Sequence, residues 1–165
     1  MGQITSYEYD QAGRLTSMIS GTLSPTGLYV TNATAGTVSS YNREDLSKPP
    51  TSISVGALPE DVVASPVIPV AYVSNYCGTG ANNCLFSQHQ STVSVIDTIT
   101  NQVIDTIVVG DGAVGLSLAI SPDGGRLYVM DEASDTVTVV DTSNYSILGI
   151  IRHMRPLMGI MHLWR

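Results

Sequence analysis

Polar and apolar side chains alternate in short runs along the chain, most clearly between residues 91 and 131. STVSVIDT and QVIDTIVVG combine this alternation with β-branched residues, which is typical of half-buried strands. AVGLSLAIS and RLYVMD follow and are separated by the turn sequence SPDGG. The pattern predicts strands at residues 92–96, 103–109, 116–120 and 127–130. Apolar residues do not recur at helical spacing here, so we expect an all-β fold with little helix.

The predicted strands belong to a unit that recurs along the chain. TVSVID at Thr92 returns as TVTVVD at Thr136, 44 residues later, and a weaker copy, TVSSYN, begins at Thr37. A second element occurs three times, each time after a Ser-Pro turn: LYVTN at Leu28, AYVSN at Ala71 and LYVMD at Leu127. Four short antiparallel strands in a repeat of about 43 residues are typical of a β-propeller blade.

The repeat frame predicts that residues 1–165 form one partial β-propeller of about three and a half four-stranded antiparallel blades. We expect a shortened blade at 1–36, a blade at 37–90 with a polar Gly/Asn-rich insertion at 78–90, a complete blade at 91–134 and a truncated blade at 135–165. Such a chain is expected to be part of a larger ring or to self-associate, because open blade edges pair with other strands.

Four segments resemble the YVTN family of propeller repeats, which is related to the YncE-like and lactonase-like seven-bladed propellers: LYVTN at Leu28, TVSVIDT at Thr92, TIVVG at Thr106 and SPDGGRLYV at Ser121. The opening QITSYEYDQAGRLTS is similar to the repeat unit of the lactonase branch. The resemblance implies a ring of about seven blades and an extracytoplasmic protein.

The charge balance narrows the classes of partner. Seven Lys and Arg against fourteen Asp and Glu give a net charge of −7, so the basic footprint of a nucleic-acid-binding protein is absent. No apolar run reaches the roughly 18 residues of a membrane span. The polar N-terminus lacks the features of a secretory signal, so a periplasmic or cell-surface location is expected only if the full-length protein carries one.

The two cysteines, Cys77 and Cys84, both lie in or beside the insertion. In an oxidising compartment they can close an eight-residue loop as a disulfide, and the alternative is a pair of free thiols. A zinc site would need two further ligands, and only His89 is near, so we expect no metal here.

Three further motifs have structural explanations. The dinucleotide-binding pattern G-x-G-x-x-G occurs at Gly110, Gly112 and Gly115. That motif needs a helix after it, but the residues that follow alternate as in a strand. We therefore predict a turn here and no bound cofactor. The histidines and methionines of the tail could bind copper in principle, but core packing or a frayed end explains them better: His153, Met154, Met158, Met161 and His162. Three aspartates at strand ends are expected to cap turns rather than act in catalysis: Asp97, Asp123 and Asp141.

These observations favour a non-catalytic propeller-repeat protein that acts as a binding scaffold for a protein or small-molecule ligand. No nucleophile elbow occurs, and no residue can be matched to a lactonase site. The alternative is a piece of a lactonase-like propeller hydrolase of the 6-phosphogluconolactonase type, which rests on fold analogy.

Overall fold

The structure, a computed structural model, describes residues 3–9, 15–22, 27–78, 90–111 and 116–152. Over these residues it contains thirteen β-strands and one short 3₁₀ turn, η1 (Ala33–Ala35). The predicted all-β fold is therefore confirmed. The strands are β1 (Gln3–Tyr9), β2 (Leu15–Thr22), β3 (Gly27–Asn32), β4 (Thr37–Asn42), β5 (Thr51–Ser54), β6 (Ala57–Ala64), β7 (Val70–Cys77), β8 (Gln90–Asp97), β9 (Gln102–Asp111), β10 (Leu116–Ile120), β11 (Arg126–Asp131), β12 (Thr136–Asp141) and β13 (Ile147–Arg152).

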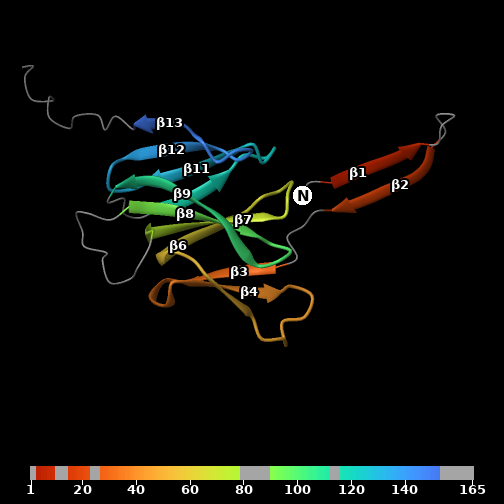
Figure 1. The fold of residues 1–165 in the computed structure, drawn as a ribbon, viewed down its shortest axis with the longest axis horizontal. Coiled ribbons are helices and arrows are strands. Elements are labelled where there is room, and N and C mark those ends of the chain that lie inside the picture. The colour runs from red at the N-terminus through yellow and green to blue at the C-terminus, as the bar shows by residue number, and fades with distance from the viewer. Residues whose placement is uncertain (1–2, 10–14, 23–26, 79–89, 112–115, 153–165) are drawn as a thin grey trace, which may run out of the picture.

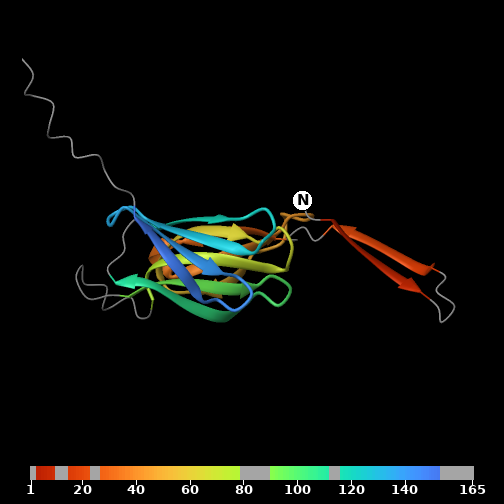
Figure 2. The ribbon, with the colours of Figure 1, turned by 90° about the horizontal axis from the view of Figure 1, so that it is seen from above.

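The strands form one hairpin and three antiparallel sheets in which neighbours in sequence are neighbours in space. β1 pairs with β2, and the first, second and third sheets are β3-β4-β5, β6-β7-β8-β9 and β10-β11-β12-β13. Figure 1 shows the three sheets as successive layers, and Figures 1 and 2 both show the β1–β2 hairpin lying apart from them. No described residue belongs to a helix long and apolar enough to cross a membrane.

All four strands predicted between residues 91 and 131 are present as β8, β9, β10 and β11. They do not share one sheet, because β8 and β9 complete the second sheet whereas β10 and β11 begin the third. The blades in space are thus offset by two strands from the expected blades 37–90 and 91–134. A repeat has the same period in any phase, so only the hydrogen-bonded ladders show which four strands form one sheet.

Two YVTN-like segments end in an asparagine whose side chain forms hydrogen bonds to the next strand of its sheet. Asn32 at the end of β3 and Asn75 at the end of β7 each donate from Nδ2 to two hydroxyl groups on the next strand, at 2.9–3.3 Å. The accepting residues are Thr37 and Ser39 for Asn32, and Thr92 and Ser94 for Asn75. Asp131 holds this position in the third sheet and instead caps its own turn by accepting from the backbone N–H of Ala133 at 3.0 Å.

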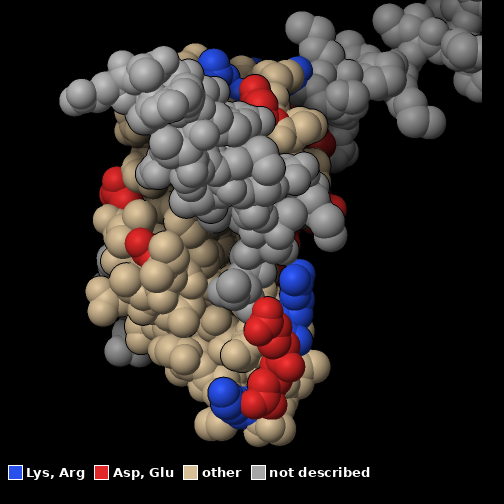
Figure 3. Space-filling model, turned by 90° about the vertical axis from the view of Figure 1, so that its right-hand side faces the viewer, with Lys and Arg blue, Asp and Glu red and all other residues tan. Residues whose placement is uncertain are grey.

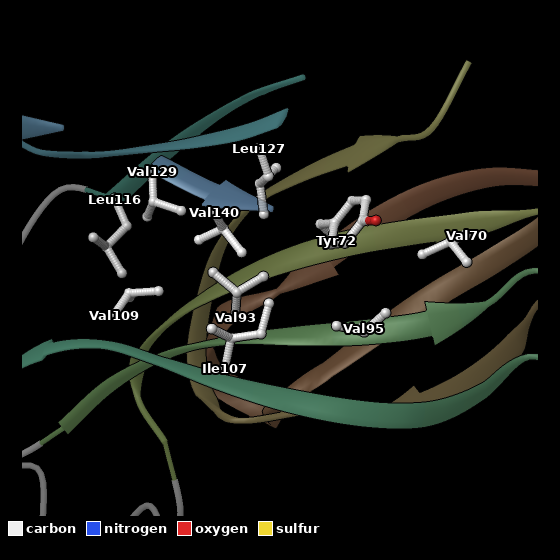
Figure 4. Packing of buried hydrophobic residues seen from close by; sticks show 10 residues of the cluster. All are labelled: Val70, Tyr72, Val93, Val95, Ile107, Val109, Leu116, Leu127, Val129 and Val140. Carbon is white, nitrogen blue, oxygen red and sulfur yellow. The ribbon is translucent and has the colours of Figure 1, made fainter. Parts of the chain in front are cut away.

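Two apolar cores hold the three sheets together. The larger core lies between the second and third sheets, and its side chains point toward one another in Figure 4: Val70, Tyr72, Val93, Val95, Ile107, Val109, Leu116, Leu127, Val129 and Val140. The smaller core lies between the first and second sheets and comprises Val38, Ile53, Ala71, Val73 and Ile96. Successive residues of a strand face opposite sides of its sheet, so β7 sends Tyr72 into the larger core and Ala71 and Val73 into the smaller one, and all eight of its residues are buried.

A pair of carboxylates also connects the second and third sheets. The register of β6 against β7 shifts between Pro59 and Val62, and this bulge carries Glu60 and Asp61. Asp61 accepts the backbone N–H of Leu118 on β10 at 2.8 Å, and Glu60 accepts that of Leu116. The first strands of two successive sheets are therefore joined by charge-assisted hydrogen bonds.

Candidate functional site

A cleft of about 400 Å³ opens between the first and second sheets. One wall comes from β3, β4, β5 and the connection between β4 and β5, and the other comes from the turn that joins β8 to β9. Its lining residues are Gly27, Tyr29, Ser40, Tyr41, Asn42, Glu44, Lys48, Pro49, Thr51, Thr98, Ile99 and Asn101. The volume falls within the range of roughly 300–1,000 Å³ that is usual for small-molecule sites.

Tyr29 joins the two walls of the cleft. Its hydroxyl donates a hydrogen bond to Oδ1 of Asn101, across 3.2 Å and 72 residues of sequence. Partial burial of the phenol raises the pKa of Tyr29. This effect outweighs the hydrogen bonds with Ser40 and Thr98, which act to lower the pKa. The phenol therefore stays neutral and acts as a hydrogen-bond donor at physiological pH.

Gly27 makes room for the Tyr29 ring at the start of β3. A Cβ atom at this position would lie 2.9 Å from Cε2 of Tyr29 and 3.2 Å from Oγ of Ser40. Any larger residue would have to displace the ring or the serine. The glycine thus allows the ring to lie against its own strand and still reach the opposite wall.

The second wall is a turn held in place by its own backbone and by one aspartate. Oδ1 of Asp97 accepts the N–H groups of Ile99 at 2.8 Å and Thr100 at 2.9 Å, and these bonds lower the pKa of Asp97. Asn101 has a φ of 55° and donates its own N–H to the carbonyl oxygen of Asp97. Asparagine tolerates this left-handed conformation better than most residues. The turn therefore presents the Asn101 amide at a fixed position.

Charges at the rim of the cleft are balanced. Lys48 lies 3.6 Å from the carboxylate of Asp45, which also accepts the N–H and hydroxyl of Ser47. Glu44 begins this turn, and its N–H is bound by Oδ1 of Asn42. Figure 3 faces this side of the molecule and shows acidic and basic side chains next to each other at its lower end, where the first sheet lies. The rim therefore presents no net positive charge.

Side chains that form hydrogen bonds dominate the lining of the cleft. The lining offers hydroxyl, amide and phenol groups, and none of its serine or threonine residues has a histidine beside it among the lining residues. No group of three or more His, Cys, Asp or Glu residues in the described part of the chain is placed to hold a metal ion. A second cleft of about 190 Å³ lies between the second and third sheets and is lined in part by Asp131, Thr138 and Arg152.

The aspartates singled out in the sequence do cap turns, as predicted. Asp141 accepts the N–H and hydroxyl of Ser143, at 3.0 and 2.7 Å, and Asp123 accepts the N–H of Gly125 at 3.0 Å and the hydroxyl of Ser121. These hydrogen bonds lower the pKa of both carboxyl groups. With Asp97, they stabilise loops and occupy no common site.

Other predicted sites lie partly or wholly outside the described residues. Cys77 is buried at the end of β7, but Cys84 and His89 lie outside, so the disulfide stays a prediction. Gly110 lies in β9 and the predicted strand at 116–120 is confirmed as β10, whereas Gly112 and Gly115 are not described. The tail from His153 to His162 is likewise outside.

The residues that shape the cleft were not identified as a site from the sequence. In the sequence, Tyr29 belongs to the repeated LYV segment and Asn101 lies between the strands predicted at 92–96 and 103–109. One local signal exists, because Gly27 stands before the first LYV segment where Arg126 stands before the third. Only a residue without a Cβ leaves the observed room for the Tyr29 ring.

Comparisons with known proteins identify the architecture. No protein-family model matches the chain. Over 106 residues the chain is 32% identical to a seven-bladed β-propeller protein of Mycobacterium tuberculosis, Rv1057. This match covers 64% of the chain but only 24% of the relative, so the chain spans about a quarter of the length of that protein.

Two solved structures have similar folds. Hydrazine synthase of Kuenenia stuttgartiensis superposes with a TM-score of 0.61 and 22% identity, over 90% of this chain and 42% of that one. A candidate 6-phosphogluconolactonase of Bacteroides fragilis superposes with a TM-score of 0.56 and 14% identity, over 89% and 38%. At these identities the likeness concerns the fold alone.

Proposed function

Because the described sheets are blades of a β-propeller, we propose that the chain is part of a non-catalytic binding scaffold whose ligand occupies the cleft between the first and second sheets. The observation that carries this proposal is the cleft itself, which two sheets build jointly and which the Tyr29–Asn101 hydrogen bond spans. Its groups are positioned by turns rather than by a catalytic network. We further propose that the complete ring has about seven blades, and that the four segments 1–36, 37–90, 91–134 and 135–165 are its repeat units in sequence.

A ligand screen by NMR tests the proposal on the full chain. The screen uses a defined mixture of neutral sugars, sugar phosphates, amino acids and short peptides, and it follows the side-chain amide signals of Asn42 and Asn101. We expect at least one component to shift these signals. Thr51→Trp fills the rim of the cleft and should abolish the shift. Thr106→Trp, on an exposed part of β9, is the matched control and should preserve it. Shifts confined to other surfaces, or none at all, would refute the proposal.

We propose an extracytoplasmic location for the full-length protein, supported by the spacing of Cys77 and Cys84 in the sequence, which allows a disulfide that closes an eight-residue loop. Intact-mass analysis after alkylation without reductant should show two fewer alkyl groups than after reduction. Equal alkylation in both samples would remove this support. Closing an eight-residue loop stabilises a fold by about 2.5 kcal/mol on the chain-entropy estimate.

The second candidate is a lactonase-like hydrolase, favoured by the structural similarity to the Bacteroides fragilis candidate 6-phosphogluconolactonase. A panel of small lactones, assayed with a full-length version of the protein, separates the two functions. A binding scaffold should hydrolyse none of them faster than buffer does. Turnover that disappears with Thr51→Trp, but not with Thr106→Trp, would replace the scaffold proposal with the hydrolase.

A further inference from the structure

We infer that the cleft between the first and second sheets takes an uncharged saccharide or polyol. This inference rests on the proposed function and names the chemical class of its ligand. It depends on three properties of the lining: neutral hydrogen-bonding side chains, two tyrosine residues, and the absence of uncompensated positive charge.

Neutral hydrogen-bonding groups dominate the lining. Hydroxyls come from Ser40, Thr51 and Thr98, and carboxamides come from Asn42 and Asn101. Hydroxyl groups donate and accept, and each carboxamide offers a donor and an acceptor side. A sugar ring presents the same mixture of donors and acceptors around its edge. The Asn42 carboxamide is held by the N–H of Glu44, and a backbone hydrogen bond to Asp97 closes the turn at Asn101, so little conformational entropy is lost when these amides bind.

Two tyrosines supply the apolar part of the site. Tyr29 and Tyr41 both line the cleft, and purely aliphatic side chains come only from Pro49 and Ile99. An aromatic ring provides a flat apolar surface with a polar tip, which matches a ligand that has C–H faces and a hydroxyl edge. Gly27 keeps the Tyr29 ring in this position, because a Cβ would intrude on it.

The charges around the cleft disfavour anionic ligands. Among the described residues that line the cleft, Lys48 is the one cation, and it is paired with Asp45 at 3.6 Å. Glu44 also lines the cleft, and Asp97 holds the turn beside it. A phosphorylated ligand would meet more negative than positive charge here, whereas phosphate sites normally use unpaired Arg, Lys or a row of backbone N–H groups. These charges therefore argue against an anionic ligand.

Isothermal titration and amide-resolved NMR on the full chain test the inference. The probes are maltotriose, cellotriose and N,N′-diacetylchitobiose, with glucose 6-phosphate and a neutral tripeptide as competing classes. We expect at least one neutral saccharide to bind and to shift the Asn42 and Asn101 amides, and glucose 6-phosphate to bind more weakly.

Two variants with matched controls locate the binding. Tyr41→Ala should weaken saccharide binding roughly fivefold, as expected for one lost aromatic contact. Tyr128→Ala, in the third sheet, should leave it unchanged. Asn101→Gly keeps the positive φ while removing the amide and should weaken binding by roughly five- to tenfold. Asp135→Gly, which has a φ of 52° outside the cleft, is its control.

The outcomes separate this inference from the proposed function. Binding of glucose 6-phosphate or the tripeptide in the cleft, with no neutral saccharide bound, would overturn the saccharide inference and leave the binding scaffold intact. Saccharide binding that survives both cleft variants would also overturn it. If nothing in the panel or in the wider screen binds the cleft, both proposals fail.

Discussion

The two interfaces between successive sheets are built from the same repeat but differ in composition. The second and third sheets share a core of ten buried residues and are joined through the carboxylates of Glu60 and Asp61. The first and second sheets share five buried residues, and a cleft occupies part of their boundary. The larger cleft, of about 400 Å³, therefore lies at the interface with the smaller buried core, and the cleft between the second and third sheets has about 190 Å³. Where fewer apolar side chains fill an interface, more polar side chains stay accessible between its two walls.

The repeat provides a direct test of this difference, because Leu28 and Leu127 begin the same LYV segment in the first and third sheets. Leu127 is 0% exposed in the larger core, and Leu28 is 50% exposed. Leu127→Ala should lower the free energy of unfolding by about 3 kcal/mol through a lost apolar side chain and a residual cavity. Leu28→Ala should cost less than about 0.5 kcal/mol. Urea denaturation measures both, and equal effects would contradict the assignment of the cores.

The carboxylate contact between β6 and β10 should have the next largest effect. Asp61→Ala removes the acceptor for the N–H groups of Leu118 and Val62, each at 2.8 Å, and should cost about 2 kcal/mol. The control is Asp105→Ala, since Asp105 is exposed on β9 and accepts the N–H of its neighbour Thr106 at 2.7 Å. The same denaturation experiment applies, and a loss of stability no larger than that of the control would show that the contact contributes little.

Tyr29 and Tyr72 hold the same position in the repeat, but loss of the hydroxyl group should change the stability of the fold in opposite directions at the two sites. The Tyr72 hydroxyl is buried in the larger core without a hydrogen-bond partner, and burial raises the pKa of Tyr72 to about 12. Tyr72→Phe should therefore stabilise the fold by up to about 1 kcal/mol, because the desolvation penalty disappears. Tyr29→Phe removes the bond to Asn101 and should cost about 0.5–1 kcal/mol. Thermal melts compare the two, and changes of the same sign would indicate that the Tyr72 hydroxyl is satisfied in solution.

The smallest effect on stability is expected when acidic pH protonates the aspartates that cap turns. Hydrogen bonds lower the pKa of Asp45, Asp97, Asp123 and Asp141 below the ordinary value of 3.8. Because the folded-state pKa is the lower one, their contribution to stability is present above pH 3.8 and is lost as the pH falls through the folded-state values. The urea midpoint measured from pH 6 to pH 2.5 should drop mainly below pH 3.8. Asp97→Asn should reduce that drop, and an unchanged pH profile would show that its turn contributes nothing.

Strand positions could be predicted from the sequence because they depend on local properties. The alternation in TVSVID and the β-branched residues of QVIDTIVVG marked β8 and β9, and the Ser-Pro turns marked the ends of β6 and β10. The cleft could not be predicted in this way. Tyr29 and Asn101 are 72 residues apart, and neither residue type indicates that the other faces it. Glu60 and Asp61 likewise carry no local signal that they accept N–H groups from another sheet.

The sequence by itself determined the all-β class, the period of about 43 residues, the four strands between residues 91 and 131 and the aspartate-capped turns, because each depends on residues close together in the chain. Only the tertiary structure decided which strands share a sheet, since a repeat of four strands has no intrinsic starting point and the backbone ladders set its phase. It also decided that the larger cleft lies between the first and second sheets and the smaller one between the second and third. That difference depends on the volumes and hydrogen-bonding groups of side chains that meet only after two sheets have packed.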